Sequence, residues 1–260
     1  MPVNTKIKLL KKQALKPDII KYTCSAPEIA NKTKPGQFIE IKVSKNIEPF
    51  LRRPISIHNV DRDNNIIEFI IQVKGKGTTI LSELEEGQML DVIGPLGEGT
   101  FDIKQCKNIA LIGGGIGIFP LFEFAKRAKK DLNVYTYLGF RNKDLVILED
   151  EFKNVSTNLT ITTDDGTYAK SGYAIDYLEK DLKVLNIDGI FACGPLPLLK
   201  KVKELAEKTN IYTQISLEEK MGCGIGVCLG CAVKYKTETE DTFVRVCKEG
   251  PIFNAKDVQI

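Results

Sequence analysis

Four cysteines near the end of the chain constrain its fold more than any other feature: Cys223, Cys228, Cys231 and Cys247. The first three follow a Cys-x4-Cys-x2-Cys spacing, and the fourth comes after a gap of fifteen residues. This spacing is typical of the thiolate ligands of a [2Fe–2S] cluster. The loop is rich in glycine, which lets backbone N–H groups approach the sulfur atoms. The sequence therefore predicts a one-electron carrier held by these four cysteines.

Two other uses of the cysteines stay open. A structural zinc site takes four cysteines, but such sites usually pair two close-spaced knuckles, whereas Cys247 stands alone. A disulfide framework fits poorly, because seven cysteines in 260 residues are sparse and residues 1–17 form no apolar signal segment. In plant-type ferredoxins the last cysteine usually lies further downstream, so we expect a smaller ferredoxin-like appendage. We expect the dispersed Cys24, Cys106 and Cys193 to be small buried residues.

The composition is that of an ordinary globular protein, with 43% hydrophobic and 27% charged residues. A net charge of +3 with scattered lysines does not indicate nucleic-acid binding. No apolar run approaches the length of a membrane span. Free thiols beside an iron–sulfur pattern point to a reducing cytoplasm. The single histidine, His58, excludes multi-histidine metal sites and argues against a Ser-His-Asp triad.

The chain divides into three regions by pattern. Residues 1–103 predict an antiparallel β-barrel with one short helix at 78–86, because short apolar runs alternate with turn residues. Residues 104–215 alternate strand-like and helix-like patterns, which predicts an α/β domain with a parallel sheet. Residues 216–260 form the small C-terminal cysteine module. The strands expected in the first region are Ile19–Ser25, Gln37–Val43, Ile55–Val60, Ile66–Val73 and Met89–Ile93.

A glycine loop in the second region predicts a nucleotide site. Glycines let a pyrophosphate approach the backbone, and the N-terminus of the following helix offers N–H donors. Two further turns, 164–166 and 193–195, each follow an expected strand, at the edge where open α/β sheets bind ligands. All three segments also fit ordinary tight turns. The residues of interest are Gly113, Gly114, Gly115, Gly117, Cys193, Gly194 and Pro195.

The first region carries a second candidate site at Arg53-Pro54-Ile55-Ser56. An arginine before a strand can pair with a phosphate, and a small hydroxyl can hydrogen-bond the edge of a flavin ring. Gly77 and Thr78 lie where a helix is expected to begin, which makes a second phosphate cradle. A surface arginine and a helix-capping threonine are the alternative interpretations.

In this order the motifs resemble the ferredoxin–NADP reductase superfamily, in which an FAD-binding β-barrel precedes a nicotinamide-binding α/β domain. The segments 216–221 and 245–253, which flank the cysteine loop, make the chain similar to the electron-transfer subunits of class B dihydroorotate dehydrogenase. The resemblance covers nearly the whole chain, and the cysteine module is its most specific part. It implies FAD, a [2Fe–2S] cluster and NAD as cofactors, with no catalytic side chain.

The resemblance also implies roles for single residues. The motif from Arg53 to Ser56 would bind the flavin, Gly77 and Thr78 would contact the FAD pyrophosphate, and Cys193 would lie near the nicotinamide ring. The chain departs from many reductases of the superfamily by ending in Val258-Gln259-Ile260 instead of an aromatic residue that covers the flavin. The residues on the strand that would line the flavin are Ile70, Ile71 and Gln72.

The implied partner is an FMN-containing catalytic subunit that oxidises dihydroorotate in pyrimidine biosynthesis, in a heterotetramer with two copies of each subunit. Neither nucleic acid nor membrane is an expected partner. The alternative is the small subunit of an NADPH-dependent ferredoxin or sulfide reductase, whose partner would be a larger iron–sulfur flavoprotein. A nucleotide-sensing or zinc-binding regulatory module is a more distant alternative. Arg141 and Lys143 leave NADP open, since basic residues after the second α/β strand suit a 2′-phosphate.

Overall fold

The structure is a computed structural model that describes residues 1–44, 47–237 and 240–260. Packing divides these residues into two compact units, each made of three stretches of chain. None of the helices in the described ranges is long and apolar enough to cross a membrane. The first unit contains Met1–Thr100, Glu218–Ala232 and Val244–Pro251, and the second contains Phe101–Leu217, Val233–Phe243 and Ile252–Ile260.

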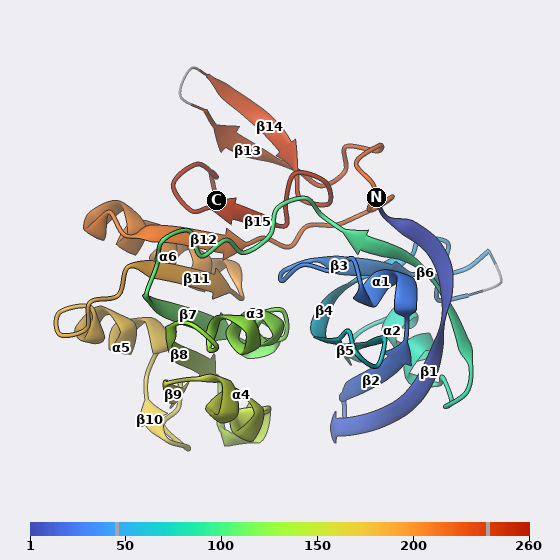
Figure 1. Ribbon diagram of the computed structural model, residues 1–260, viewed down its shortest axis with the longest axis horizontal. Helices are drawn as coiled ribbons and strands as arrows, with labels where there is room; N and C mark the ends of the chain where they lie inside the picture. Colours follow the sequence, from blue (N-terminus) through green and yellow to red (C-terminus); the bar gives the residue numbers. More distant parts are fainter. Residues whose placement is uncertain (45–46, 238–239) are drawn as a thin grey trace. The chain divides into compact units, whose positions relative to one another are not determined.

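A closed antiparallel barrel forms the body of the first unit, with strand order β1-β2-β5-β4-β3-β6 (Figure 1). Alternation along β3 sends Ile39 and Ile41 into the barrel core and turns Glu40 outward. Inside, the rings of Tyr22 and Phe69 stack with centroids 5.1 Å apart. The elements are β1 (Val3–Lys16), β2 (Ile19–Ser25), α1 (Pro27–Ala30), β3 (Phe38–Ile41), β4 (Arg53–Asp61), β5 (Ile66–Gln72), α2 (Lys76–Ser82) and β6 (Met89–Leu96).

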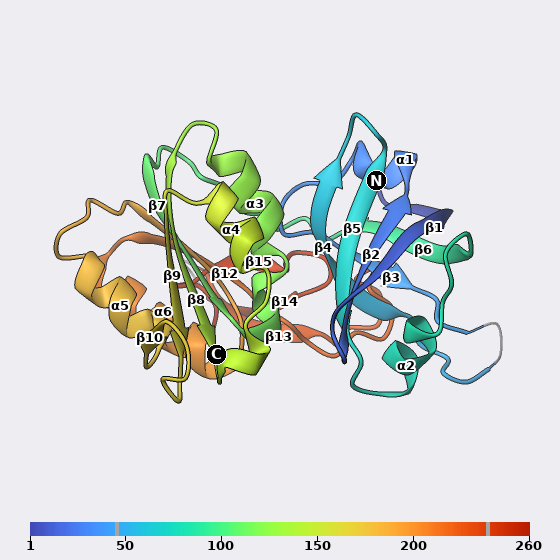
Figure 2. The same cartoon turned by 90° about the horizontal axis from the view of Figure 1, so that it is seen from below.

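A sheet of order β10-β9-β8-β7-β11-β12-β15 forms the second unit, and β15 alone among the described strands of this sheet runs antiparallel to its neighbour. Helices α3 and α4 cover one face, and α5 and α6 cover the other (Figure 2). The elements are β7 (Asn108–Gly114), η1 (Gly115–Ile118), α3 (Leu121–Ala128), β8 (Asn133–Phe140), η2 (Lys143–Leu145), α4 (Glu149–Val155), β9 (Asn158–Thr163), β10 (Lys170–Ser171), α5 (Ala174–Asp181), β11 (Gly189–Cys193), α6 (Leu196–Thr209) and β12 (Tyr212–Ser216).

The C-terminal segment begins as an irregular cysteine loop. It continues as the two-stranded β13 (Ala232–Lys236) and β14 (Asp241–Arg245) and ends with β15 (Ile252–Asn254). The buried Ile252 and Phe253 let β15 join the α/β sheet, where Phe253 pairs with Ile215. The predicted fold class is confirmed: a barrel, a parallel-sheet domain and a small C-terminal module. The two boundaries drawn at 103 and 215 stay a prediction, since packing distributes the C-terminal segment over both units.

Candidate cofactor sites

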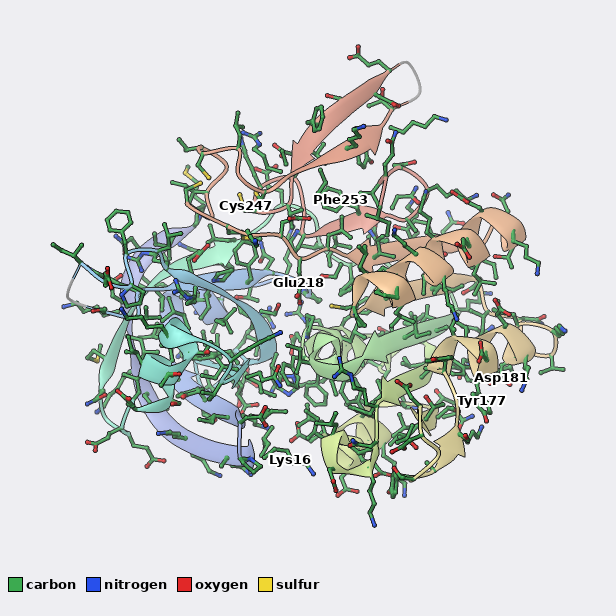
Figure 3. All side chains as sticks on the ribbon, turned by 180° about the vertical axis from the view of Figure 1, so that it is seen from behind. Lys16, Tyr177, Asp181, Glu218, Cys247 and Phe253 are labelled. Atoms are coloured by element: carbon green, nitrogen blue, oxygen red, sulfur yellow. The ribbon has the colours of Figure 1, made fainter. Side chains whose placement is uncertain are left out.

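The cysteine loop of the first unit brings backbone N–H groups to its sulfur atoms. Val227 and Cys228 donate to Cys223 Sγ at 3.3 and 3.4 Å, and Cys247 donates to Cys231 Sγ at 3.5 Å. Figure 3 shows sulfur atoms, in yellow, gathered beside the labelled Cys247. Cys231 and Cys247 are buried, Cys223 is half-buried and Cys228 is exposed, so the loop presents one ligand cysteine to its surroundings.

These thiols are arranged as two pairs. The backbone N–H of Cys228 donates to Cys223 Sγ, and the backbone N–H of Cys247 donates to Cys231 Sγ. Within the described parts of the chain, no three Cys, His, Asp or Glu side chains converge to hold one metal ion. A two-iron cluster takes two thiolates at each iron, whereas a structural zinc takes four at one point. Four cysteines in two neighbouring pairs match this arrangement of two thiolates at each iron.

Cys223 and Cys247 differ in how the surrounding protein shifts their pKa values. Burial acts to raise the pKa of Cys223, but N–H groups from Cys228, Ile225 and Val227 outweigh it and lower that pKa to about 6. Burial, followed by the hydrogen bond with Cys231, raises the pKa of Cys247 to about 12. Hydrogen bonds from the loop backbone and from the Cys228 side chain therefore favour the thiolate form of Cys223.

A buried carboxyl group, which the sequence analysis missed, lies under this loop. Glu40 points outward from β3 and is 1% exposed, because the loop at Gly224 covers it. Neither carboxyl oxygen has a hydrogen-bond partner among the described residues. Burial raises the pKa of Glu40 to about 7; Arg52 and Arg53 act to lower it, and Cys223 adds to the increase. In sequence, a lone polar residue in an alternating strand is typical of a solvent-facing position, so no signal marked it.

Arg53 and Gly77, which the sequence analysis assigned to one flavin site, do lie together. A Cβ placed on Gly77 would overlap the guanidinium of Arg53. The neighbouring Arg52 is occupied elsewhere, since its Nη2 pairs with Asp91 Oδ1 at 2.6 Å. Arg53 donates through Nη1 to the carbonyls of Leu51 and Arg52, and its Nε and Nη2 lie beside Gly77, where an anion would be recognised.

Because side chains alternate along a strand, the remaining residues of the expected flavin site fall into two groups, one facing the barrel core and one facing outward. Ile55 packs against the barrel core and Ile71 belongs to it, so these two can reach a ligand only through their backbone. Pro54, Ser56 and Ile70 lie at the alternate positions, which face outward. The Ser56 hydroxyl makes no hydrogen bond to the described residues.

Two polar members of that site are tied to neighbouring groups. The Gln72 side chain donates to Asp18 Oδ2 at 2.9 Å. The hydroxyl of Thr78 accepts the N–H groups of Lys74 and Gly75 at 2.9 and 3.1 Å. Helix α2 begins two residues before Thr78, so this threonine supports the first turn from inside the helix and is not its N-cap.

In the second unit, the glycine loop after β7 packs on the turn after β11. A Cβ on Gly117 would lie 2.5 Å from the Cα of Gly194, and one on Gly114 would lie 2.8 Å from Pro195 Cδ. A Cβ on Gly113 would likewise crowd Ile118. These glycines are thus required by packing, as the tight-turn interpretation expects. Gly115 differs, because it has a φ of +55° and open space beside it.

Cys193 is buried at the end of β11, directly before this turn. Strands β7 and β11 are neighbours in the sheet, so their carboxyl ends bring the two predicted turns together. This is the position where open α/β sheets bind nucleotides. His58, in contrast, lies fully buried in β4 of the barrel.

Comparison with known proteins decides the family. Residues 6–101 match the oxidoreductase FAD-binding domain, and residues 218–259 match the iron–sulfur cluster binding domain of dihydroorotate dehydrogenase B. The chain is 40% identical over 229 residues to the dihydroorotate dehydrogenase B (NAD(+)) electron transfer subunit of Bacillus pumilus, covering 86% of both. The chain belongs to the family of dihydroorotate dehydrogenase B electron-transfer subunits.

A second member of this family, from Geobacillus thermodenitrificans, is also 40% identical, over 239 residues and 91% of both chains. The family models therefore confirm the FAD-binding barrel and the iron–sulfur domain expected from the sequence. A solved structure of an NADH-dependent reduced ferredoxin–NADP oxidoreductase is also similar, with a TM-score of 0.86 and 30% identity. It covers 100% of this chain and 91% of its own.

Proposed function

We propose that this chain carries electrons from the FMN of a dihydroorotate-oxidising subunit to NAD⁺, through a [2Fe–2S] cluster and FAD. The observation that carries the proposal is the pairing of Cys223 with Cys228 and Cys231 with Cys247. Both pairs lie in the compact unit that contains the FAD-domain barrel. Within one packed unit the protein can fix the positions of both cofactors.

Bound FAD would supply the chemistry that joins two-electron hydride exchange to single-electron transfer. The chain's own residues would bind and orient FAD and the nicotinamide nucleotide. Arg53, beside Gly77, would pair with the FAD pyrophosphate, and the free hydroxyl of Ser56 would hydrogen-bond the flavin edge. The open backbone at Gly115 would receive the nucleotide, with Cys193 near the nicotinamide. We assign no side chain to proton transfer.

The exposed part of the cysteine loop is the proposed contact with the FMN subunit. Val227 and Leu229 flank the exposed Cys228 and are 73% and 62% exposed, and Ile225 is 46% exposed. Apolar side chains gathered around a ligand cysteine suit a protein partner better than water. We assign the complex two copies of each subunit, as the family resemblance implies. We place it in the cytoplasm, because none of the seven cysteines, all of them among the described residues, is in a disulfide.

The loop after β9 supports NAD over NADP. The N–H of Asp165 donates to the carbonyl of Arg141 at 3.3 Å, so an acidic pair, Asp164 and Asp165, adjoins the basic segment after β8. The Asp165 carboxylate is held in place by the N–H and hydroxyl of Thr167, at 3.0 and 2.7 Å. Carboxylates at this edge favour a ribose hydroxyl and repel a 2′-phosphate.

The test is anaerobic co-purification from the native host, followed by absorbance spectra as dihydroorotate and NAD⁺ are added in turn. The proposal expects an FMN-containing partner, bleaching by dihydroorotate and recovery of colour with NAD⁺. The full-length similarity to the ferredoxin–NADP oxidoreductase favours one alternative. A larger iron–sulfur flavoprotein as partner, with bleaching by NADPH but not by dihydroorotate, would establish that alternative instead.

A further inference from the structure

Arg245 joins two parts of the cysteine module. It ends β14, two residues before Cys247, and its Nη1 donates to the carbonyl oxygen of Gly226 in the cysteine loop at 2.7 Å. Its Nε and its own backbone N–H both donate to Glu249 Oε2, at 3.0 and 2.7 Å. Its Nη2 contacts the other oxygen of the same carboxylate. Glu249 therefore fixes the guanidinium with one edge directed at the loop.

The peptide bond between Gly226 and Val227 is hydrogen-bonded at both ends. Its oxygen accepts from Arg245, and its N–H donates to Cys223 Sγ at 3.3 Å. Hydrogen bonds in such a chain polarise and strengthen one another. Hydrogen bonds to the sulfur ligands of an iron–sulfur cluster help to set its reduction potential. Arg245 thus acts on a ligand cysteine through a single peptide bond.

We propose that the Arg245–Glu249 pair is a positioning element that sets the reduction potential of the cluster through the Val227 N–H bond to Cys223. This inference rests on the cluster of the proposed function. The guanidinium raises the potential by orienting that N–H group and by its positive charge. Glu249 orients the guanidinium and cancels part of its charge. The two side chains are 26% and 32% exposed, so solvent screens part of the effect.

Other contacts hold the turn that contains Cys247 when Arg245 is altered. Val246 N–H donates to the carbonyl of Cys231 at 3.1 Å, and Glu98 N–H, from the end of the barrel, donates to the carbonyl of Lys248 at 2.7 Å. Replacing the guanidinium therefore removes the orientation of one peptide while the fourth cysteine stays anchored. A change in reduction potential in such a variant would therefore reflect an electronic effect of Arg245 on the cluster and not the displacement of Cys247.

The test uses the complex with its catalytic partner, purified anaerobically, and a redox titration followed by the EPR signal of the reduced cluster. Arg245→Gln is expected to make cluster reduction about threefold less favourable, which corresponds to about 30 mV lower potential for one electron. Glu249→Gln is expected to shift it about threefold in the opposite direction, because the guanidinium loses its counter-charge while the amide oxygen still accepts its hydrogen bond. Arg245→Lys keeps the charge but loses the planar fork, so its shift is smaller than that of Arg245→Gln.

The matched control is Arg127→Gln, which breaks another Arg–Glu pair four residues apart, with Glu123 in α3. It is expected to leave the potential unchanged. Unchanged potentials in all variants, or shifts of one sign in Arg245→Gln and Glu249→Gln, overturn the inference. If Arg245→Gln holds too little iron to titrate, Glu249→Gln decides alone, because its potential must rise. A complex of the unaltered chain without any cluster signal would overturn the proposed function itself.

Discussion

The carboxyl group of Glu40 lies directly under Gly224, so close that a Cβ at Gly224 would overlap it. Gly224 also has a φ of +69°, which side-chain-bearing residues rarely adopt. Both facts have one cause: the cysteine loop packs on the side chain of Glu40, which points outward from β3 and is buried by the loop. The position of Cys223 therefore depends on the absence of a side chain one residue later.

Gly224→Ala is expected to reduce the affinity of the loop for its cluster by about tenfold or more, through backbone strain and overlap with Glu40. Iron and sulfide content of the anaerobically purified chain measures the loss. Gly172→Ala is the control for strain alone, since Gly172 has a φ of +100° and nothing within 4 Å. The double variant with Glu40→Ala is expected to recover part of the iron. Full iron loading in Gly224→Ala would contradict this account.

Arg52 and Arg53 are adjacent in the sequence, but replacing each is expected to affect a different property: folding stability for Arg52 and FAD affinity for Arg53. Arg53→Gln is expected to weaken FAD binding about tenfold or more, since a charge-assisted hydrogen bond contributes about 1.5–3 kcal/mol. Arg52→Gln breaks the ion pair with Asp91 and leaves the FAD site in place. It is expected to lower the free energy of unfolding by about 1 kcal/mol with FAD affinity nearly unchanged.

Flavin fluorescence titration and thermal unfolding, carried out on both arginine variants, separate the two effects. If Arg52→Gln lost FAD as strongly as Arg53→Gln, the distinction drawn from the contacts of these two residues would be wrong.

Cysteine replacement tests the relay. Cys228→Ser is expected to remove the cluster, because one iron loses a thiolate ligand, and to bring electron transfer from the partner down to background. Bound FAD and its reduction by NADH are expected to stay, since the barrel residues assigned to FAD are untouched. Cys106→Ser is the control, because that buried thiol belongs to neither cysteine pair and donates to the carbonyl of Asp188 at 3.5 Å. Normal electron transfer from the partner in Cys228→Ser would refute the relay.

The strands that the sequence predicted correctly are those whose apolar residues fill the barrel or the centre of the parallel sheet. The strand expected at Ile66–Val73 and found at Ile66–Gln72 is an example, since nearly every residue there is packed on one or both faces. Val3–Lys16 was missed because it is rich in lysine and mostly exposed, and its pairing with β2 and β6 is what makes it a strand. Likewise, the three residues of β15 are defined by their partner β12.

The candidate site shows the same division. Glycine and cysteine spacing is local, so the loops at 113–117 and 223–231 were found from the sequence alone. Glu40 and Arg245 act through contacts with residues far away in the sequence: Gly224 for the first and Gly226 for the second. No local pattern predicts such a contact, and only the folded chain identifies it.

The buried thiol of Cys24 gives a prediction for alkaline pH. Cys24 is fully buried in the barrel, and this burial raises its pKa from 9.0 to about 12. The folded state therefore favours the neutral thiol, and the stability this provides is complete below about pH 9 and is lost as the pH rises towards 12. Within that window the group contributes a slope of about 1.4 kcal/mol per pH unit.

Cys24→Val is expected to make the loss of stability between pH 9 and pH 12 shallower, because the valine does not titrate and fills a similar apolar space. Urea unfolding of the whole chain at several pH values measures the slope. The control is Cys106→Val, in which the thiol that is removed has its pKa raised less, to about 11. That variant is expected to change the dependence of stability on pH over a narrower pH range, from about pH 9 to about pH 11. An unchanged slope in Cys24→Val would show that this thiol stays neutral in the unfolded chain too, or that the barrel opens before it ionises.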